Sequence, residues 1–280
     1  MPGPEETTPF GLYLSNLLSR RVDGPPGILN ELYSLHGELQ SETSVEAASR
    51  VVVRMSSTMD REMARVRAAL GGGVTPFSTL RGYFLEEVAL TIAKLTVRRL
   101  DPGIVVRKFS TGDGVITGLS LRYGRGGLPT PTEMRFRKDR EDVILGFPRD
   151  LRLTDRSAGG ELTLANQVVP LCVIACKIYI DATRLENVLA KARSILPSYA
   201  GASFFVLAEW DALGAEWHGA SGEILDALYA PVERLVFLRQ GQRPGNEVLR
   251  QESMAHPYRR DQLRVLSERI KRAYQNWSAA

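Results

Sequence analysis

The chain is poor in cysteine and histidine and has no long apolar run. Its 280 residues include 2 cysteines and 3 histidines, too few for a disulfide framework or a histidine-rich metal site. Cys172 and Cys176 therefore read as buried thiols in a reducing compartment. No apolar stretch approaches the length of a membrane span, and the N-terminus lacks the pattern of a secretory signal. We expect a cytoplasmic protein without membrane contact.

The sequence also lacks a phosphate-binding glycine loop. The cluster Gly71-Gly72-Gly73 is not followed by Lys-Ser or Lys-Thr and is not preceded by a predicted strand. A hydrophobic content of 44% and a charged content of 24% are typical of an ordinary soluble globular protein. The net charge of +4 and the pI near 9.1 are mildly basic, with the excess supplied by arginine. This balance is compatible with a polyanionic partner but does not identify one.

Helical periodicity dominates the first part of the chain, and the triple glycine with Pro76 indicates a boundary after it. We divide the chain into an N-terminal helical region, residues 1–75, and a core with a C-terminal helix, residues 76–280. The helices expected up to the first strand span Thr8 to Arg20, Pro25 to about Leu39, Ser44 to Gly71, and Ser78 or Thr79 to Arg99.

Strands and helices mix in the remainder, which predicts an α/β (α+β mixed) fold with a central mixed β-sheet flanked by helices. Gly112-Asp113-Gly114 is expected to be the turn between the first two strands, and residues 122–140 are expected to form a loop. The strands span Ile104 to Phe109, Val115 to Leu121, one opening at Asp142, one reaching Lys177, Ser203 to Ala208 and Arg234 to Leu238. The helices span Ala182 to Ile195, Gly222 to Tyr229 and Tyr258 to Tyr274.

The most informative residue is Lys177, near the end of an apolar run that begins at Val168. A buried strand has little reason to carry an ammonium group unless that group is paired or used, because an unpaired buried charge is costly. Upstream, Asp142 opens the strand Val143-Ile144-Leu145-Gly146. An aspartate that enters one strand and a lysine that leaves its neighbour form the framework of a metal-dependent phosphodiesterase.

The order of these elements resembles the core of the PD-(D/E)XK nucleases, and within that superfamily the Type II restriction endonucleases. The segment from Ala175 through Lys177 to Asp181 is similar to the Glu-x-Lys motif followed by an aromatic residue, an aliphatic residue and Asp. The segment from Gly82 to Glu86 resembles the Gly-x-x-aliphatic-Glu pattern on the helix before the sheet. The likeness covers roughly residues 78 to 210 and depends on motif order, because each motif is short.

The resemblance implies a role for each matching residue. Asp142 would be the primary Mg²⁺ ligand, Glu86 an accessory ligand, and Lys177 the group that orients or deprotonates the attacking water. It also implies duplex DNA as the substrate, a homodimer that cuts both strands, and a cognate DNA methyltransferase as the genetic partner. In such an enzyme the N-terminal helical region, residues 1–75, would make dimer or DNA contacts.

Ala175 breaks the pattern, because a methyl group stands where the family has its second metal carboxylate. We favour removal of a glutamate by engineering. A natural loss of catalysis with DNA binding retained is the second explanation. A carboxylate moved to the next helix, with Glu186 as the nearest candidate, is the third. In the first two cases the protein would bind DNA and cut it poorly or not at all.

Each assignment has a plainer alternative. Lys177 could extend to solvent from a strand end, Asp142 could be the solvated start of a strand, and Glu86 could lie on a solvated helix face. The densest basic stretch would contact DNA phosphates or bases, or else form a solvated loop. Its members are Arg122, Arg125, Arg135, Arg137, Lys138 and Arg140.

Overall fold

The computed structural model describes residues 8–19, 27–71, 74–108, 115–123, 131–139, 142–154, 161–199, 201–213, 234–245 and 248–279. The helices are α1 (Pro9–Ser19), α2 (Gly27–Ser41), α3 (Val45–Arg61), α4 (Met63–Ala69), α5 (Val74–Val97), α6 (Ala182–Ile195), the short 3₁₀ helix η1 (Leu196–Ser198), α9 (Leu249–Ala255) and α10 (Arg260–Ala279). The strands are β1 (Val105–Arg107), β2 (Val115–Tyr123), β3 (Pro131–Asp139), β4 (Val143–Thr154), β5 (Glu161–Ile180), β6 (Ser203–Asp211) and β7 (Arg234–Phe237).

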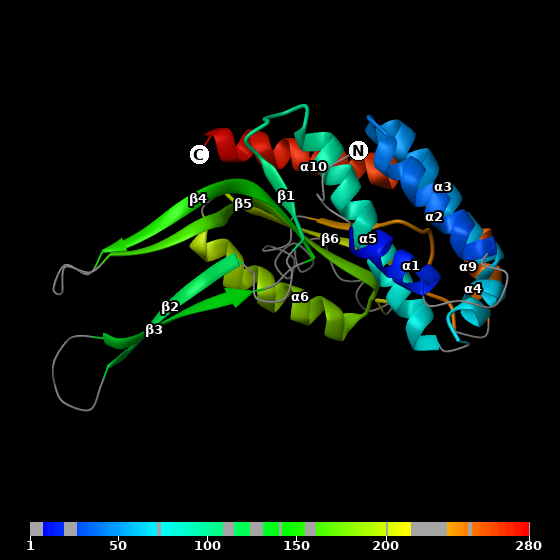
Figure 1. Cartoon of the computed structure of the whole chain (residues 1–280), viewed down its shortest axis with the longest axis horizontal. Coiled ribbons are helices and arrows are strands. Elements are labelled where there is room, and N and C mark those ends of the chain that lie inside the picture. Colours follow the sequence, from blue (N-terminus) through cyan, green and yellow to red (C-terminus); the bar gives the residue numbers. More distant parts are fainter. Residues whose placement is uncertain are drawn as a thin grey trace.

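A five-stranded sheet with the order β1-β4-β5-β6-β7 forms the centre of the molecule. β1 with β4 and β4 with β5 pair antiparallel, whereas β5 with β6 and β6 with β7 pair parallel. The sheet is therefore mixed, and helices cover it on both sides (Figure 1). This confirms the predicted fold class of a central mixed sheet flanked by helices.

The alternation of side chains along β5 divides the core into two apolar clusters. Cys172, Ile174 and Cys176 pack with residues of α5 and α10 on one face. Val173 and Ala175 pack with residues of α6 on the other face. Both cysteines are buried on the same face, as the sequence predicts.

The N-terminal helices belong to the first of these clusters. Phe10 of α1 and Leu29 of α2 lie in the same apolar cluster as Leu145 and Phe205 of the sheet. Ser44 caps α3, which begins at Val45 close to the expected start, and the predicted third helix is interrupted at Glu62, which ends α3 and precedes α4. Gly71 has a φ of +87°, a conformation that glycine adopts at little cost at a helix end. The division at residues 75 and 76 stays a prediction.

The start predicted for the next helix at Ser78 or Thr79 is wrong, because α5 begins at Val74. Proline is tolerated in the first turn of a helix, where the missing N–H would have no partner, so Pro76 lies inside α5. The Thr79 hydroxyl donates to the Thr75 carbonyl instead of capping a helix.

The predicted pairing of the first two strands is also wrong. β1 pairs with β4, whereas β2 pairs with β3 in a separate two-stranded sheet, and the supposed turn at 112–114 lies outside the described residues. Much of the predicted loop at 122–140 is strand, because a two-stranded ribbon tolerates charged residues on its solvated surfaces. The predicted helix at 222–229 lies outside the described residues.

Two antiparallel hairpins extend away from the helices on the left of Figure 1. One is the outer part of β4 and β5, which remain paired as far as Thr154 and Glu161. The other is β2 with β3, and the Tyr199 hydroxyl beyond α6 donates to the Ile116 carbonyl at 2.6 Å near its base. Among the described helices, none is long and apolar enough to cross a bilayer.

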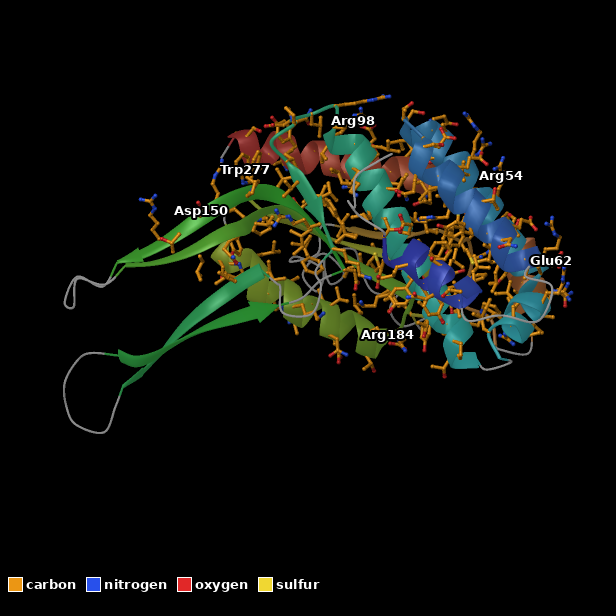
Figure 2. The ribbon with its side chains drawn as sticks, in the orientation of Figure 1. Arg54, Glu62, Arg98, Asp150, Arg184 and Trp277 are labelled. Atoms are coloured by element: carbon orange, nitrogen blue, oxygen red, sulfur yellow. The ribbon has the colours of Figure 1, made fainter. Side chains whose placement is uncertain are left out.

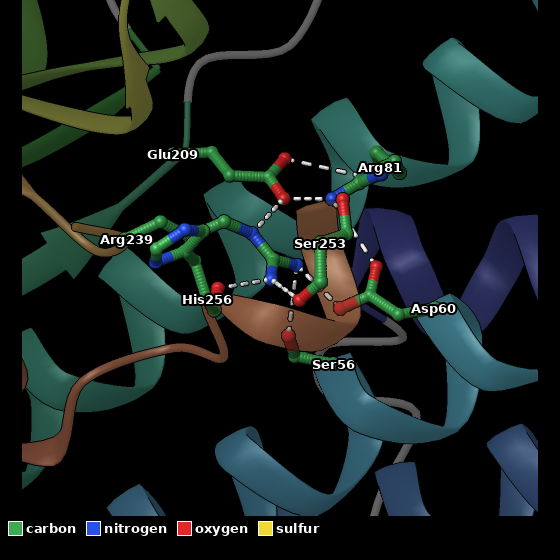
Figure 3. Close-up of polar contacts among 7 residues, drawn as sticks. All are labelled: Ser56, Asp60, Arg81, Glu209, Arg239, Ser253 and His256. Atoms are coloured by element: carbon green, nitrogen blue, oxygen red, sulfur yellow. Dashed lines mark hydrogen bonds and ion pairs between the residues drawn. The ribbon is translucent and has the colours of Figure 1, made fainter. Parts of the chain in front are cut away.

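A buried network of charges joins the N-terminal helices to the sheet (Figure 3). The Arg239 guanidinium donates to Glu209 Oε1 at 2.7 Å and to Asp60 Oδ2 at 2.6 Å. Arg81 of α5 donates to both oxygens of Glu209, and Arg239 also donates to the carbonyls of Ser253 and His256. Because each buried charge faces an opposite charge, the network fixes α3, α5 and α9 against β6 without leaving an isolated ion.

Candidate active site

Asp142 and Lys177 meet where β4 begins and β5 ends. Asp142 immediately precedes β4, and the register that pairs Val143 with Ile174 brings it beside the last residues of β5. The Asp142 Oδ2 atom accepts a hydrogen bond from the Cys176 backbone N–H at 2.6 Å and lies 3.3 Å from the Lys177 ammonium. The pair is partly buried, with side chains 25% and 28% exposed, so neither residue is simply a solvated strand end.

Glu86 of α5 is the third charged residue of this group, because it lines the same cavity as Lys177. Its carboxylate pairs with Lys108, which follows β1, and only 18% of its side chain is exposed. Burial raises the pKa of Glu86, and Asp142 raises it further, while Lys108 and Lys177 lower it. The sequence therefore identified three residues, from α5, β4 and β5, that the fold brings together.

Cys176 lies at the centre of these four charges. Cys176 is 9% exposed, and burial raises the pKa of its thiol well above the ordinary value for cysteine. Asp142 and Glu86 raise that pKa further, whereas Lys177 and Lys108 lower it. The thiol is consequently a core group and not a nucleophile.

Ala175 occupies a different environment from the other predicted site residues. It is fully buried in the apolar cluster beneath α6, opposite Val206 of β6, whereas Lys177 lines a cavity on the surface. A carboxylate at position 175 would enter an apolar cluster. Glu186, the alternative carboxylate, is exposed on α6. Asp181 caps α6 by accepting a hydrogen bond from the Arg184 N–H, as the sequence predicts.

The site offers a small divalent cation two carboxylates, those of Asp142 and Glu86, and no larger cluster of ligands among the described residues. Within the described residues, no group of three or more His, Cys, Asp or Glu side chains is arranged to hold a metal. Mg²⁺ in proteins often takes only one or two carboxylates, with waters and substrate phosphates completing its octahedron. Asp142 and Glu86 supply two such carboxylates, so they fit that mode of binding.

Lys108 is a charged member of the site that the sequence did not single out. It follows β1, and the signal that could have found it is its place at the end of a predicted strand. Of the predicted DNA contacts, Arg122 lies on β2 and Arg135, Arg137 and Lys138 lie on β3, where the backbone alone is described. Arg125 and Arg140 lie outside the described residues.

The fold and this site define an α+β protein with a partly buried Asp-Lys-Glu group at the ends of two central strands. No family model matches the sequence, and no curated protein matches it. Among solved structures, the chain is similar to one described as the native BbvCI A2B2 tetramer at low resolution. The two are 14% identical, the TM-score is 0.46, and the match covers 95% of this chain and 96% of that chain. A likeness at this level assigns no activity, and the proposal that follows is based on the residues themselves.

Proposed function

We propose that the chain is a Type II-like restriction endonuclease that acts on the phosphodiester bonds of duplex DNA with Mg²⁺. The observation that carries the proposal is the 3.3 Å contact between Lys177 and Asp142, with Glu86 lining the same cavity as Lys177. These residues come from three separate elements, and the fold brings their charges to one partly buried place.

Each residue of the group has a task in such a reaction. Asp142 and Glu86 would hold Mg²⁺, which when bound supplies positive charge to the phosphate in the transition state. The Lys177 ammonium would position the attacking water and hold or release a proton at its Nζ atom. Lys108 would keep Glu86 ionised, because its ammonium lowers the pKa of that carboxylate against the effect of burial.

The second candidate is a DNA-binding protein without catalysis that keeps this fold. The observation in its favour is Ala175, which is fully buried in an apolar cluster where a nuclease of this type would need a ligand. Both candidates bind DNA through cationic residues, so both predict affinity that falls steeply with salt. A homodimer and a cognate methyltransferase are parts of the first proposal only.

A cleavage assay on long phage DNA separates the candidates. We would compare the chain with Ala175→Glu, in Mg²⁺ and in EDTA, with Ala175→Gln as the matched uncharged control. Discrete fragments from Ala175→Glu in Mg²⁺ alone would establish a sequence-specific nuclease that the alanine impairs.

The other outcomes are equally informative, provided that circular dichroism shows Ala175→Glu and Ala175→Gln to be folded. Salt-dependent DNA binding without cutting by any version would favour the non-catalytic protein. Neither binding nor cutting would contradict both candidates.

A further inference from the structure

A cavity of about 450 Å³ lies directly beside the Lys177 ammonium. Its wall is built from α4, α5, β5, α6, β6 and the segment after β7, and it includes Glu86 and Lys177. This volume lies within the usual range of small-ligand sites, about 300–1,000 Å³. The cavity is therefore large enough for more than a single ion and is continuous with the proposed active site.

The wall is strongly cationic. It carries one carboxylate, that of Glu86, and five cations. These cations are Arg67, Arg81, Lys177, Arg184 and Arg243. Arg81 is committed to Glu209 and Asp60 in the buried network. Arg184 also pairs with Asp181, and Lys177 pairs with Asp142. Even after these pairings, a cavity with this wall favours an anionic ligand.

Aromatic rings hold the guanidinium groups in place. The guanidinium carbons of Arg184 and Arg243 lie 3.9 Å and 4.2 Å from the centre of the Tyr179 ring. Those of Arg67 and Arg81 lie 5.2 Å and 5.6 Å from the Phe77 ring. Stacking on a ring lowers the freedom of an arginine without using its N–H groups. Donors fixed in this way lose little entropy when a ligand arrives.

Two buried donors on the wall have no acceptor among the described residues. Trp210 is 1% exposed, and its indole N–H has no hydrogen-bond partner there. The Nε–H group of Arg67 likewise has none. A buried donor that lacks a partner is costly, and native proteins rarely leave one. Both residues line the cavity, so we expect small side-chain shifts on binding to bring these donors onto acceptor oxygens of a ligand.

We propose that this cavity binds a phosphate group. Arginine forks, a lysine and the neutral indole N–H of Trp210 match the several acceptor oxygens and the negative charge of a phosphate. The identity of this phosphate rests on the proposed function. We assign the cavity to the DNA phosphate that neighbours the phosphate held at Asp142 and Lys177. The same chemistry could come from a free phosphate compound, and the experiment distinguishes these sources.

The first arm measures phosphate binding without metal or DNA. Inorganic phosphate and thymidine 5′-monophosphate would be titrated and followed by phosphorus NMR line broadening. We expect Arg243→Gln to raise the Kd by about tenfold or more, as for loss of a charge-assisted contact. We expect Trp210→Phe, which keeps a ring and removes the N–H, to raise it about threefold. The matched control is Arg98→Gln, which removes an equal charge from an exposed residue just after α5, far from Arg184 in Figure 2.

The second arm measures the affinity of the same variants for sheared duplex DNA by anisotropy. A parallel loss of phosphate and DNA affinity, absent in Arg98→Gln, supports the DNA assignment. Loss of phosphate affinity with unchanged DNA affinity supports a free phosphate ligand and overturns the DNA assignment.

No phosphate binding at millimolar concentration, or an equal loss in the Arg98→Gln control, overturns the cavity proposal. The first arm measures phosphate binding and not DNA cleavage, so a negative result there does not contradict the nuclease proposal. A failed cleavage assay likewise leaves the phosphate site standing.

Discussion

The Lys177 ammonium lies 3.3 Å from the Asp142 carboxylate, across the pairing of β4 with β5. The two residues are 35 positions apart in the sequence. Their approach depends on the long hairpin between these strands, which sets the register at Val143 and Ile174.

Replacing Asp142 by asparagine should increase DNA affinity in EDTA. The change keeps an oxygen for the Cys176 N–H but removes a negative charge that would face a phosphate. One unit charge at 4 Å in water is worth about 1 kcal/mol, or about fivefold in affinity. Fluorescence anisotropy in EDTA and in Mg²⁺ provides the measurement. With Mg²⁺ present the advantage should shrink or reverse, and an identical gain in both buffers would count against Asp142 as a metal ligand.

Glu86→Gln should stabilise the protein at neutral pH in the absence of divalent cations. Burial, with Asp142 adding to it, raises the pKa of Glu86. The folded state therefore binds more protons than the unfolded state above the unfolded pKa of about 4.3. The unfolding free energy then falls as pH rises through the folded pKa, and glutamine removes that loss. Thermal melts from pH 3 to pH 8 should show a gain that disappears on the acid side.

Glu62→Gln is the matched control for that titration. Hydrogen bonding with Arg65 lowers the pKa of Glu62, so its ionised form is favoured in the folded state. Its contribution is present above the unfolded pKa and is lost as pH falls. The two variants should thus change the pH profile in opposite directions, and profiles of the same sign would contradict the account of Glu86.

Gly146→Ala should destabilise the fold by about 2 kcal/mol or more, as expected for overpacking against backbone. A Cβ atom at this position would lie 2.1 Å from the Val169 carbonyl oxygen. The glycine stands at a register shift between β4 and β5, where the two backbones approach closely. Urea unfolding measures the effect. Gly37→Ala in α2 is the control, because a Cβ there meets nothing within 4 Å and alanine should add about 0.5–1 kcal/mol of stability.

Arg239→Met should cost about 3–5 kcal/mol of unfolding free energy. The change leaves Glu209 and Asp60, each 1% exposed, with Arg81 as their remaining cation in the network. Arg54→Met on α3 removes an exposed pair with Glu38 and should cost no more than about 1 kcal/mol. Equal losses from the two variants in chemical denaturation would mean that the buried network is not what joins the helices to the sheet.

Local sequence was sufficient for much of the architecture. The start of α6 follows from the Asp181 side chain, which accepts a hydrogen bond from a backbone N–H three residues later. Helical spacing of apolar residues predicted α1 and α2, and the apolar runs predicted β5 and β6. In the candidate site, Asp142, Lys177 and Glu86 were recognisable because their motifs occur in a fixed order along the chain.

Strand pairing was harder to predict from the sequence, because it depends on contacts between residues that are far apart along the chain. β1 and β2 are near neighbours in sequence, yet they pair in different sheets. The cationic cavity shows the same limit, since Arg67, Tyr179 and Arg243 each come from a different element. The clash that makes Gly146 necessary likewise involves a carbonyl on the neighbouring strand.

The sequence by itself determined α1, α2, α6, the apolar strands β5 and β6 and the identity of the charged residues, because these follow from spacing and apolar runs of short range. Tertiary structure alone decided that Ala175 faces the apolar cluster beneath α6 while Lys177 reaches the cavity. It also decided that Lys108 pairs with Glu86 and that Arg239 is buried between two acids. The physical reason is that burial, pairing and charge depend on which elements pack together, and packing brings together residues that no local pattern connects.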